Sequence, residues 1–228
     1  MARVRGGRAR SSERIFILAS LHPERSVHES APPIVVLASA SPRRTHLLTE
    51  AGVAHVVRVP PVDDAGIALP LDGASLVECL AQVKAHQVRC GAGEVVIAAD
   101  TLCLLDGRVM GKPTDVQEAR AMLLLLAERS HEVVTGLAIR HAGRSMGFAV
   151  SATVSLGALS GQDVEQYLGS GRWRGKAGAY DYPERLAGGW LLSCDGDPTT
   201  VSGLPMRRLL PELTSLGVRV ALGSGAGR

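Results

Sequence analysis

The sequence predicts an α/β fold with a mixed β-sheet, because it contains both isolated buried strands and paired strands. Residues 34–39 (IVVLAS) and 94–101 (EVVIAADT) are short apolar runs typical of buried strands, and a helical pattern follows the first of them. Residues 131–159 instead alternate apolar and polar side chains, which is typical of antiparallel strands. We therefore expect one α/β domain with a mixed sheet and flanking helices rather than a doubly wound parallel sheet.

The first part of the chain alternates strands and helices. After the strand at 34–39, Ser41 is placed to cap a helix that starts at Pro42 and ends at Gly52. Three further segments follow in order: a strand (54–60), a polar loop with two adjacent aspartates (60–73) and a helix (74–90).

The second part of the chain combines hairpins with helices. Residues 102–113 predict two strands joined by an Asp-Gly turn at 106–107, and residues 131–159 predict a hairpin that turns at 141–144. The remaining segments are a helix (114–129), a short capped helix (160–171), a strand followed by a turn (189–205) and a last helix (204–217).

Composition limits both the core and the partners of this protein. The chain has 228 residues and is 46% hydrophobic but only 3% aromatic, so Val, Leu, Ala and Ile must form the core. Residues 1–32 carry the net charge of +3, and the remainder is neutral. A neutral domain with few aromatic side chains is poorly suited to nucleic acid, so we expect no nucleic-acid partner.

The ends of the chain and its cysteines indicate where the protein works. We expect a disordered extension at 1–32, a folded domain at 33–218 and a disordered tail at 219–228. An organellar transit peptide is the alternative for the extension, although its glutamates are untypical of one.

No apolar run has the roughly 18 residues of a membrane helix, so we expect no membrane partner. No CxxC pair occurs among Cys79, Cys90, Cys103 and Cys194, which favours buried thiols in a reducing, cytoplasmic compartment.

The turn after the first strand, SASPRR at 39–44, is a candidate anion site. A strand-to-helix turn leaves backbone N–H groups free where the helix dipole is positive, and Ser39 and Ser41 add hydroxyl donors. Arg43 and Arg44 can grip phosphate oxygens, yet two cations are unfavourable at a helix N-terminus unless an anion compensates them. The alternative is an ordinary capped helix with two solvated arginines.

Asp100 is the candidate catalytic acid. A strand rich in Val, Ile and Ala runs directly into this carboxylate, and active sites of α/β folds gather at strand ends. A carboxylate there can hold Mg²⁺ or accept a proton from water. The alternative is a strand-end aspartate that caps a turn with Thr101.

Three lysines and a pair of aspartates complete the candidates. Lys84 lies in a helix, Lys112 in a turn and Lys176 in the segment RGKAGAYD, although most lysines are solvated surface residues. Asp63 and Asp64 are adjacent in a loop, and one of them is a candidate to share a metal with Asp100. The sequence has no GxxxxGK[ST] loop, no HExxH pair and no GxSxG turn, which removes the best-known alternatives.

Six motifs in order resemble the Maf family, the septum-formation-associated nucleoside triphosphate pyrophosphatases. They span residues 34–217 and read LASASPRR, LAQVKA, AADTLCLLDGRVMGKP, HEVVTGLAI, GKAGAYD and DGDPTTVSGLP. The resemblance implies an elongated mixed sheet with two lobes around a cleft, similar to inosine triphosphate pyrophosphatases. It also implies hydrolysis of a nucleoside triphosphate to the monophosphate and pyrophosphate with Mg²⁺ or Mn²⁺. The expected substrates are non-canonical or modified nucleotides, and the resemblance suggests a homodimer.

The resemblance assigns roles to individual residues. Asp100 matches the family's catalytic acid and metal ligand, while Arg43 and Thr101 match positions linked to substrate choice. The polar cleft residues of the family are matched by Ser39, Arg44, Lys84, Lys112 and Lys176.

Two departures from the family pattern matter. The family usually has a glutamate in the loop after its second strand, and Asp64 is the best match here. One large subgroup continues Gly-Ile-Gln-Gly after KAGAY, whereas this chain has Asp181, Tyr182, Pro183 and Glu184. A preference for thymidine or uridine triphosphate therefore does not carry over from the resemblance.

Two other functions remain open on the sequence alone. A nucleotide-binding regulator of cell division would keep the arginines and lysines without needing the acid, and Asp100 argues against it. A phosphatase acting on a phosphorylated metabolite would release orthophosphate instead of pyrophosphate.

Overall fold

The computed structural model describes residues 31–61 and 71–220 of the chain. The predicted N-terminal extension and C-terminal tail lie almost entirely outside the described residues, so both stay predictions. Asp63 and Asp64 also lie outside the described residues, and the metal-ligand role of Asp64 is likewise still a prediction.

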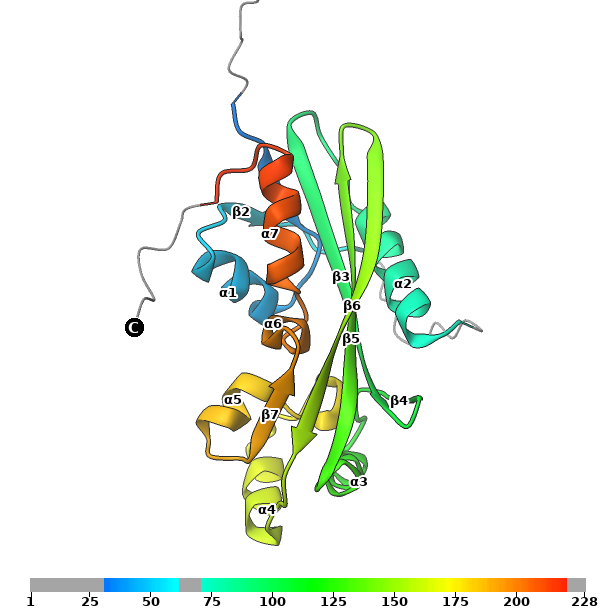
Figure 1. The fold of residues 1–228 in the computed structure, drawn as a ribbon, viewed down its shortest axis with the longest axis vertical. Coiled ribbons are helices and arrows are strands. Elements are labelled where there is room, and N and C mark those ends of the chain that lie inside the picture. The colour runs from blue at the N-terminus through cyan, green and yellow to red at the C-terminus, as the bar shows by residue number, and fades with distance from the viewer. Residues whose placement is uncertain (1–30, 62–70, 221–228) are drawn as a thin grey trace, which may run out of the picture. The chain divides into compact units, whose positions relative to one another are not determined.

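The described residues form a seven-stranded mixed sheet, which confirms the predicted fold class (Figure 1). The strands follow the order β2-β1-β3-β5-β6-β7, with β4 paired to β3. Strand β1 is parallel to β2 and β3, and every other pairing is antiparallel. The strands are β1 (Ile34–Leu37), β2 (His55–Val57), β3 (Glu94–Leu105), β4 (Arg108–Met110), β5 (Arg129–His141), β6 (Arg144–Leu156) and β7 (Leu192–Asp195).

Most helices lie where the sequence pattern predicts them. They are α1 (Pro42–Glu50), α2 (Gly73–Gln87), α3 (Val116–Leu126), α4 (Gly161–Gly169), the 3₁₀ turn η1 (Ala177–Ala179), α5 (Tyr182–Ala187), α6 (Pro198–Val201) and α7 (Met206–Ser215). The sequence pattern does not predict α5, and it predicts a turn where α6 lies. Both begin at an aspartate whose side chain accepts a backbone hydrogen bond, from Glu184 to Asp181 and from Thr199 to Asp197. Aspartate caps can therefore define helices too short to show a periodic pattern.

Strand β3 is longer than the sequence predicts, because the predicted strand 94–101 and the first arm of the next hairpin are continuous. Residues 95–104 of β3 pair without interruption with β5, and Asp100 lies opposite Gly136. The strand therefore extends beyond its parallel neighbour β1, whose last paired residue is Leu37. This extra length carries the candidate catalytic residues.

Helix α2 packs against one face of the sheet. Its Ala81 and Ala85 form a cluster with strand residues such as Val36 and Val96. Gly136 of β5 lies so close to α2 that an added Cβ would be 2.2 Å from the backbone of Val77. This close packing fixes the position of α2, and α2 carries Lys84. No described helix is long and apolar enough to cross a bilayer.

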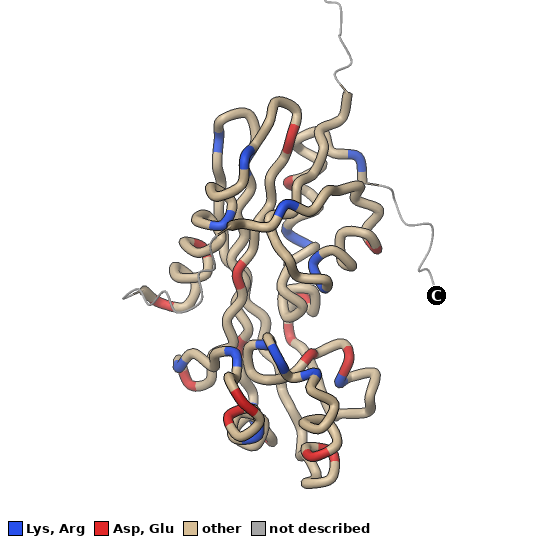
Figure 2. The backbone as a smooth tube through the Cα atoms, turned by 180° about the vertical axis from the view of Figure 1, so that it is seen from behind, with Lys and Arg blue, Asp and Glu red and all other residues tan. Residues whose placement is uncertain are grey.

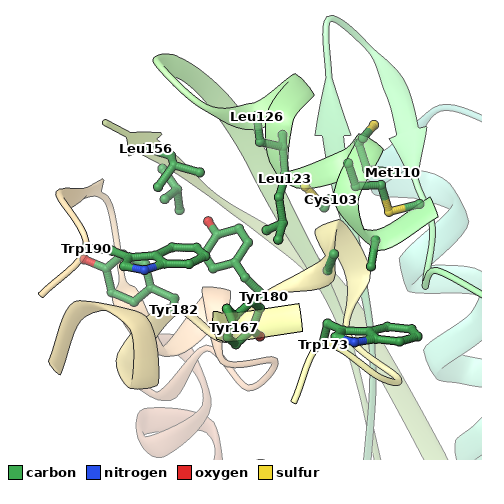
Figure 3. Packing of buried hydrophobic residues seen from close by; sticks show 14 of the residues in the cluster. Cys103, Met110, Leu123, Leu126, Leu156, Tyr167, Trp173, Tyr180, Tyr182 and Trp190 are labelled. Carbon is green, nitrogen blue, oxygen red and sulfur yellow. The ribbon is translucent and has the colours of Figure 1, made fainter. Parts of the chain in front are cut away.

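The opposite face has two hydrophobic clusters. One joins strands β1, β3 and β5 to helices α1 and α7 through residues such as Leu37, Leu48 and Leu209. The other surrounds the far part of β3 and contains most of the chain's aromatic side chains, among them Trp173, Tyr180 and Trp190 (Figure 3). The second cluster holds the segment that carries Lys176 against the sheet.

Candidate active site

A stretch of β3 with no strand beside it forms the centre of the site. On one edge, β1 pairs with residues 94–97 of β3 and β4 pairs with residues 103–105. Among the described strands, none pairs with residues 98–102 on that edge. Asp100 and Thr101 lie in this open stretch, where a ligand can approach them without displacing a strand.

Lys84 and Asp100 form an ion pair between α2 and this open stretch. The Lys84 Nζ donates to the Asp100 Oδ1. The side chains are largely buried, with 16% of Lys84 and 15% of Asp100 exposed. Such a partly buried charged pair is held more firmly than a surface pair, because water competes less for either group. The pair therefore presents a fixed carboxylate beside a fixed ammonium.

Arg44 connects three separate segments on the other side of Asp100. Its Nε donates to the Gly203 carbonyl at 2.8 Å, and its Nη1 donates to the Ser39 Oγ at 3.0 Å. Its Nη2 also donates to the Thr101 Oγ1 at 3.3 Å. The planar guanidinium thus joins the end of β1, the open part of β3 and the turn before α7.

The start of α1 differs from the prediction in one respect. Ser41 occupies the N-cap position, but its side chain makes no capping hydrogen bond. The Ser39 Oγ instead accepts a hydrogen bond from the Ser41 backbone N–H at 3.2 Å. The predicted cap position of Ser41 is therefore confirmed, but the side-chain cap of the first turn of α1 is not formed. That turn keeps N–H groups for another acceptor.

One cavity of about 750 Å³ contains all these groups. It is lined by every candidate residue that the structure describes: Ser39, Ser41, Arg43, Arg44, Lys84, Asp100, Thr101, Lys112 and Lys176. These residues come from five parts of the sequence between positions 39 and 176. Residues from separate motifs along the chain therefore lie together around a single cavity.

The model of the family described as "Maf-like protein" matches residues 34–216 of the chain. This chain belongs to the Maf family. Several relatives carry the name dTTP/UTP pyrophosphatase. The relative from Symbiobacterium thermophilum is 39% identical over 194 residues, which cover 85% of this chain and 98% of the relative. The relative from Bordetella avium is 40% identical (82% and 96% covered), and that from Thermus thermophilus is 39% identical (83% and 98% covered).

Arg43 has a protein counter-charge in this Maf-family chain, which the sequence analysis did not foresee. Its Nη1 donates to the Asp181 Oδ2 at 2.9 Å, although the two residues are 138 positions apart. Asp181 also caps α5 and lies 3.9 Å from the Lys176 Nζ. An anionic ligand is thus not needed to explain why a cation is tolerated at the start of α1.

Glu184 extends this group of charges away from the cavity. Its carboxylate contacts Lys176 at 3.4 Å, Arg172 at 3.0 Å and Arg185 at 2.6 Å. Burial alone would raise the pKa of Glu184, but the three cations outweigh it and lower the pKa below its usual value. Residues 181–184, where this chain departs from a large subgroup, therefore set the charge around Lys176.

The inner wall of the cavity is uncharged. The His131 Nε2 lies 2.7 Å from the Tyr180 hydroxyl, and burial lowers the pKa of His131 to about 4. Burial also raises the pKa of the Cys103 thiol to about 12, so Cys103 remains a thiol and is not a nucleophile. This wall suits the neutral part of a ligand better than its phosphates.

Two residues of the cavity wall escaped the sequence analysis. Asp181 was noted only as a departure from the subgroup pattern, because nothing local links it to Arg43. Arg174 also lines the cavity, and only its place two residues before Lys176 could have drawn attention to it. Basic and acidic residues are interspersed along the described backbone (Figure 2).

Proposed function

We propose that this chain hydrolyses a nucleoside triphosphate to the nucleoside monophosphate and pyrophosphate, with non-canonical or modified nucleotides as the substrates it removes. The observation that carries the proposal is the Lys84–Asp100 pair on the open stretch of β3, inside a cavity lined by further cations. The names of the relatives support the same reaction.

Asp100 is the residue that orients the attacking water. Its carboxylate accepts a hydrogen bond from the water and takes up the proton as the oxygen attacks the α-phosphorus. Lys84 fixes the carboxylate, and its ammonium would stabilise the phosphate that is attacked. Positioning and charge stabilisation provide most of the rate acceleration in such reactions.

The cations of the cavity and the start of α1 bind the triphosphate. Arg43 and Lys112 neutralise its negative charge from two sides, and the backbone after Ser39 cradles one phosphate with its free N–H groups. Pyrophosphate leaves with most of the developing charge, so these contacts matter most as the bond to the α-phosphorus breaks.

A divalent cation, Mg²⁺ or Mn²⁺, fits a part of this donor set. Within the described residues no group of three or more His, Cys, Asp or Glu side chains could enclose a metal ion. Magnesium sites that use one or two carboxylates together with substrate phosphates need no such group. Asp100 would hold the ion, with Asp64 as its second ligand, and the bound ion would neutralise phosphate charge.

The base and sugar lie toward the uncharged inner wall and Lys176. Thr101 and Lys176 face this part of the ligand, and Asp181 and Glu184 set the charge around Lys176. The relatives named for dTTP and UTP do not fix the base here, because residues 181–184 differ from the Gly-Ile-Gln-Gly segment. A homodimer is compatible with this arrangement, and no contact described here depends on one.

Product analysis with a panel of canonical and modified nucleoside triphosphates tests the proposal. We expect pyrophosphate and a nucleoside monophosphate in equal amounts, with one group of bases clearly preferred. Orthophosphate as the first product would instead identify a phosphatase. Tight nucleotide binding without turnover at any metal concentration would favour a nucleotide-binding regulator.

A further inference from the structure

The cations that line the cavity differ in how the protein compensates them. Four of them donate to protein oxygen atoms: Arg43, Arg44, Lys84 and Lys176. The other two, Lys112 and Arg174, are exposed and have no ion pair within residues 31–61 and 71–220. Among the cations that line the cavity, the uncompensated positive charge therefore lies on these two side chains.

We propose that Arg174 binds the outer phosphates of the substrate together with Lys112, and that it makes the protein select triphosphates over diphosphates and monophosphates. This inference rests on the proposed function, because it adds a residue to the same cavity. Arg174 is thus a specificity-determining residue for the length of the phosphate chain.

The fold holds Arg174 against a buried aromatic ring. Its guanidinium carbon lies 4.4 Å from the centre of the Trp173 ring, and Trp173 is only 3% exposed. The indole N–H of Trp173 donates to the Leu168 carbonyl at 3.1 Å, which fixes the ring. In Figure 3, Trp173 lies on the side of the aromatic cluster where Cys103 and Met110 are found. Arg174 therefore has a rigid platform although it is exposed to solvent.

Contact with the ring leaves the hydrogen-bond donors of Arg174 available. A cation–π contact uses the charge and the face of the guanidinium, whereas its N–H groups point outward in the guanidinium plane. Two of them can meet two oxygens of one phosphate, which a lysine ammonium cannot match geometrically. The arrangement suits a phosphate better than a neutral base.

Lys112 is attached to the same part of the structure as Arg174. The Gly178 N–H donates to the Gly111 carbonyl at 3.1 Å, so the turn that carries Lys112 is bonded to the segment after Arg174. The pairing of Met110 with Cys103 also directs the chain after β4 back along the open stretch of β3. Lys112 and Arg174 therefore approach one ligand from adjoining segments.

The outer phosphates are the part of the substrate that these two cations suit. The α-phosphate must lie at Asp100, where the attacking water is oriented and Lys84 already supplies a cation. Lys112 lies in the turn after β4 that runs back along the open stretch of β3, and Arg174 lies in the loop before η1 that is bonded to this turn. Both cations are therefore placed to meet phosphates next to the one at Asp100. A diphosphate or monophosphate offers Arg174 fewer phosphate oxygens to bind. This difference is the origin of the proposed preference for triphosphates.

Arg174→Ala tests the inference, with Arg174→Lys as the charge-preserving variant and Arg108→Ala as the matched control. Arg108 is an exposed arginine of β4 that does not line the cavity. We expect Arg174→Ala to lower kcat/KM for a nucleoside triphosphate about tenfold or more, and to affect the corresponding diphosphate much less. Arg174→Lys should lose part of this selectivity, and Arg108→Ala should retain all of it.

Isothermal titration calorimetry with inorganic tripolyphosphate separates this inference from the proposed function. We expect weaker binding to Arg174→Ala than to the wild-type protein or to Arg108→Ala. If the wild-type protein releases pyrophosphate but Arg174→Ala keeps its tripolyphosphate affinity and its selectivity, the inference is wrong and the function stands. If no nucleotide is hydrolysed yet tripolyphosphate binding still requires Arg174, the function fails and the phosphate site stands.

Discussion

Arg43 and Arg44 are neighbours in the sequence, but they contact different parts of the fold. Arg43 reaches across the cavity to Asp181, while Arg44 turns inward to Ser39, Thr101 and the Gly203 carbonyl. Arg43 faces the Asp181 carboxylate, so a bound phosphate would replace a protein counter-charge at Arg43. Arg44 serves mainly to hold the residues around Asp100 in place.

Gly203→Ala should disturb this arrangement more than an equally strained substitution elsewhere. Gly203 has a φ of +95°, and an added Cβ would lie 3.2 Å from the Thr101 Oγ1 and 3.3 Å from the Arg44 Nε. We expect a loss of stability of about 1–3 kcal/mol from the backbone strain and a clear loss of kcat/KM from the displaced Arg44. Thermal melting and steady-state kinetics measure the two effects.

Gly143→Ala is the control for that substitution. Gly143 has a φ of +77°, but an added Cβ would meet no atom within 4 Å. It should therefore lose stability from strain while keeping its activity. Equal kinetics for the two variants would contradict a role for Arg44 in positioning the site.

At the residue scale, the sequence predicts which polar side chains share a site but not all of their partners. Nine candidate residues line one cavity, because their motifs occur at strand ends and turns that an α/β fold brings together. The Arg43–Asp181 pair could not be predicted, since it depends on how α1 and α5 are placed in space. Ser41 takes the predicted N-cap position, but its side chain accepts no hydrogen bond from the first turn of α1, which the sequence pattern does not show.

Strand β3 is the element on which the site depends. It pairs with β5 along nearly its whole length, while its other edge is shared between β1 and β4 with a gap between them. A long strand that is fixed on one edge can expose a short stretch on the other without fraying. The gap therefore offers Asp100 and Thr101 to a ligand on a rigid support.

The start of β3 is secured by an ion pair that should make stability depend on pH. Nη1 and Nη2 of Arg58 both donate to the Glu94 carboxylate, and this contact together with the Gly91 N–H lowers the pKa of Glu94 from 4.5 to about 2. A carboxylate with a lowered pKa stabilises the fold fully above its unfolded pKa, and this stabilisation is lost as the pH falls toward 2.

Glu94→Gln should therefore be less stable than the wild-type protein at neutral pH, and the difference should shrink between about pH 4.5 and pH 2. Chemical denaturation across this range measures it. Glu50→Gln is the control, because the one ion pair of Glu50 among the described residues is with His46, on the exposed side of α1. A difference that is constant with pH, or equal for both variants, would contradict the role of the Arg58–Glu94 pair.

At the element scale, apolar runs predict the strands well, and helices are predicted where the periodic pattern is long enough. The length of β3 could not be predicted, because its continuity depends on pairing with β5, which lies much later in the chain. Local sequence patterns do not contain such long-range pairing. The short helices α5 and α6 were missed because four to six residues show no period.

The described fold and the family match both begin close to residue 34, which bears on the N-terminal segment. Strand β1 starts at Ile34, and the Maf-like match starts at the same residue. We expect a variant without residues 1–30 to keep its stability and its kcat/KM. Deletion of residues 1–40 is the control, since it removes β1 and should abolish folding. Loss of activity in the shorter deletion would show that the segment contributes to the enzyme.

At the scale of the whole molecule, the sequence predicts the family and the mixed sheet, and it leaves the details of the ligand open. The order of six motifs is enough to predict the family, because each motif contributes residues to the lining of the same cavity. The motifs do not predict the preferred base, because residues 181–184 depart from the subgroup pattern. The carboxylates of Asp181 and Glu184 act through their contacts with Lys176.

The rate of pyrophosphate release by Asp100→Asn tests the central claim most directly. Asp106→Asn is the matched control, because Asp106 follows the same strand but pairs with Arg129 outside the cavity. With the best triphosphate of the panel, we expect Asp100→Asn to lose about 10²-fold or more in kcat while Asp106→Asn stays near the wild-type rate. Near-normal pyrophosphate release by Asp100→Asn would contradict the claim that this carboxylate orients the attacking water.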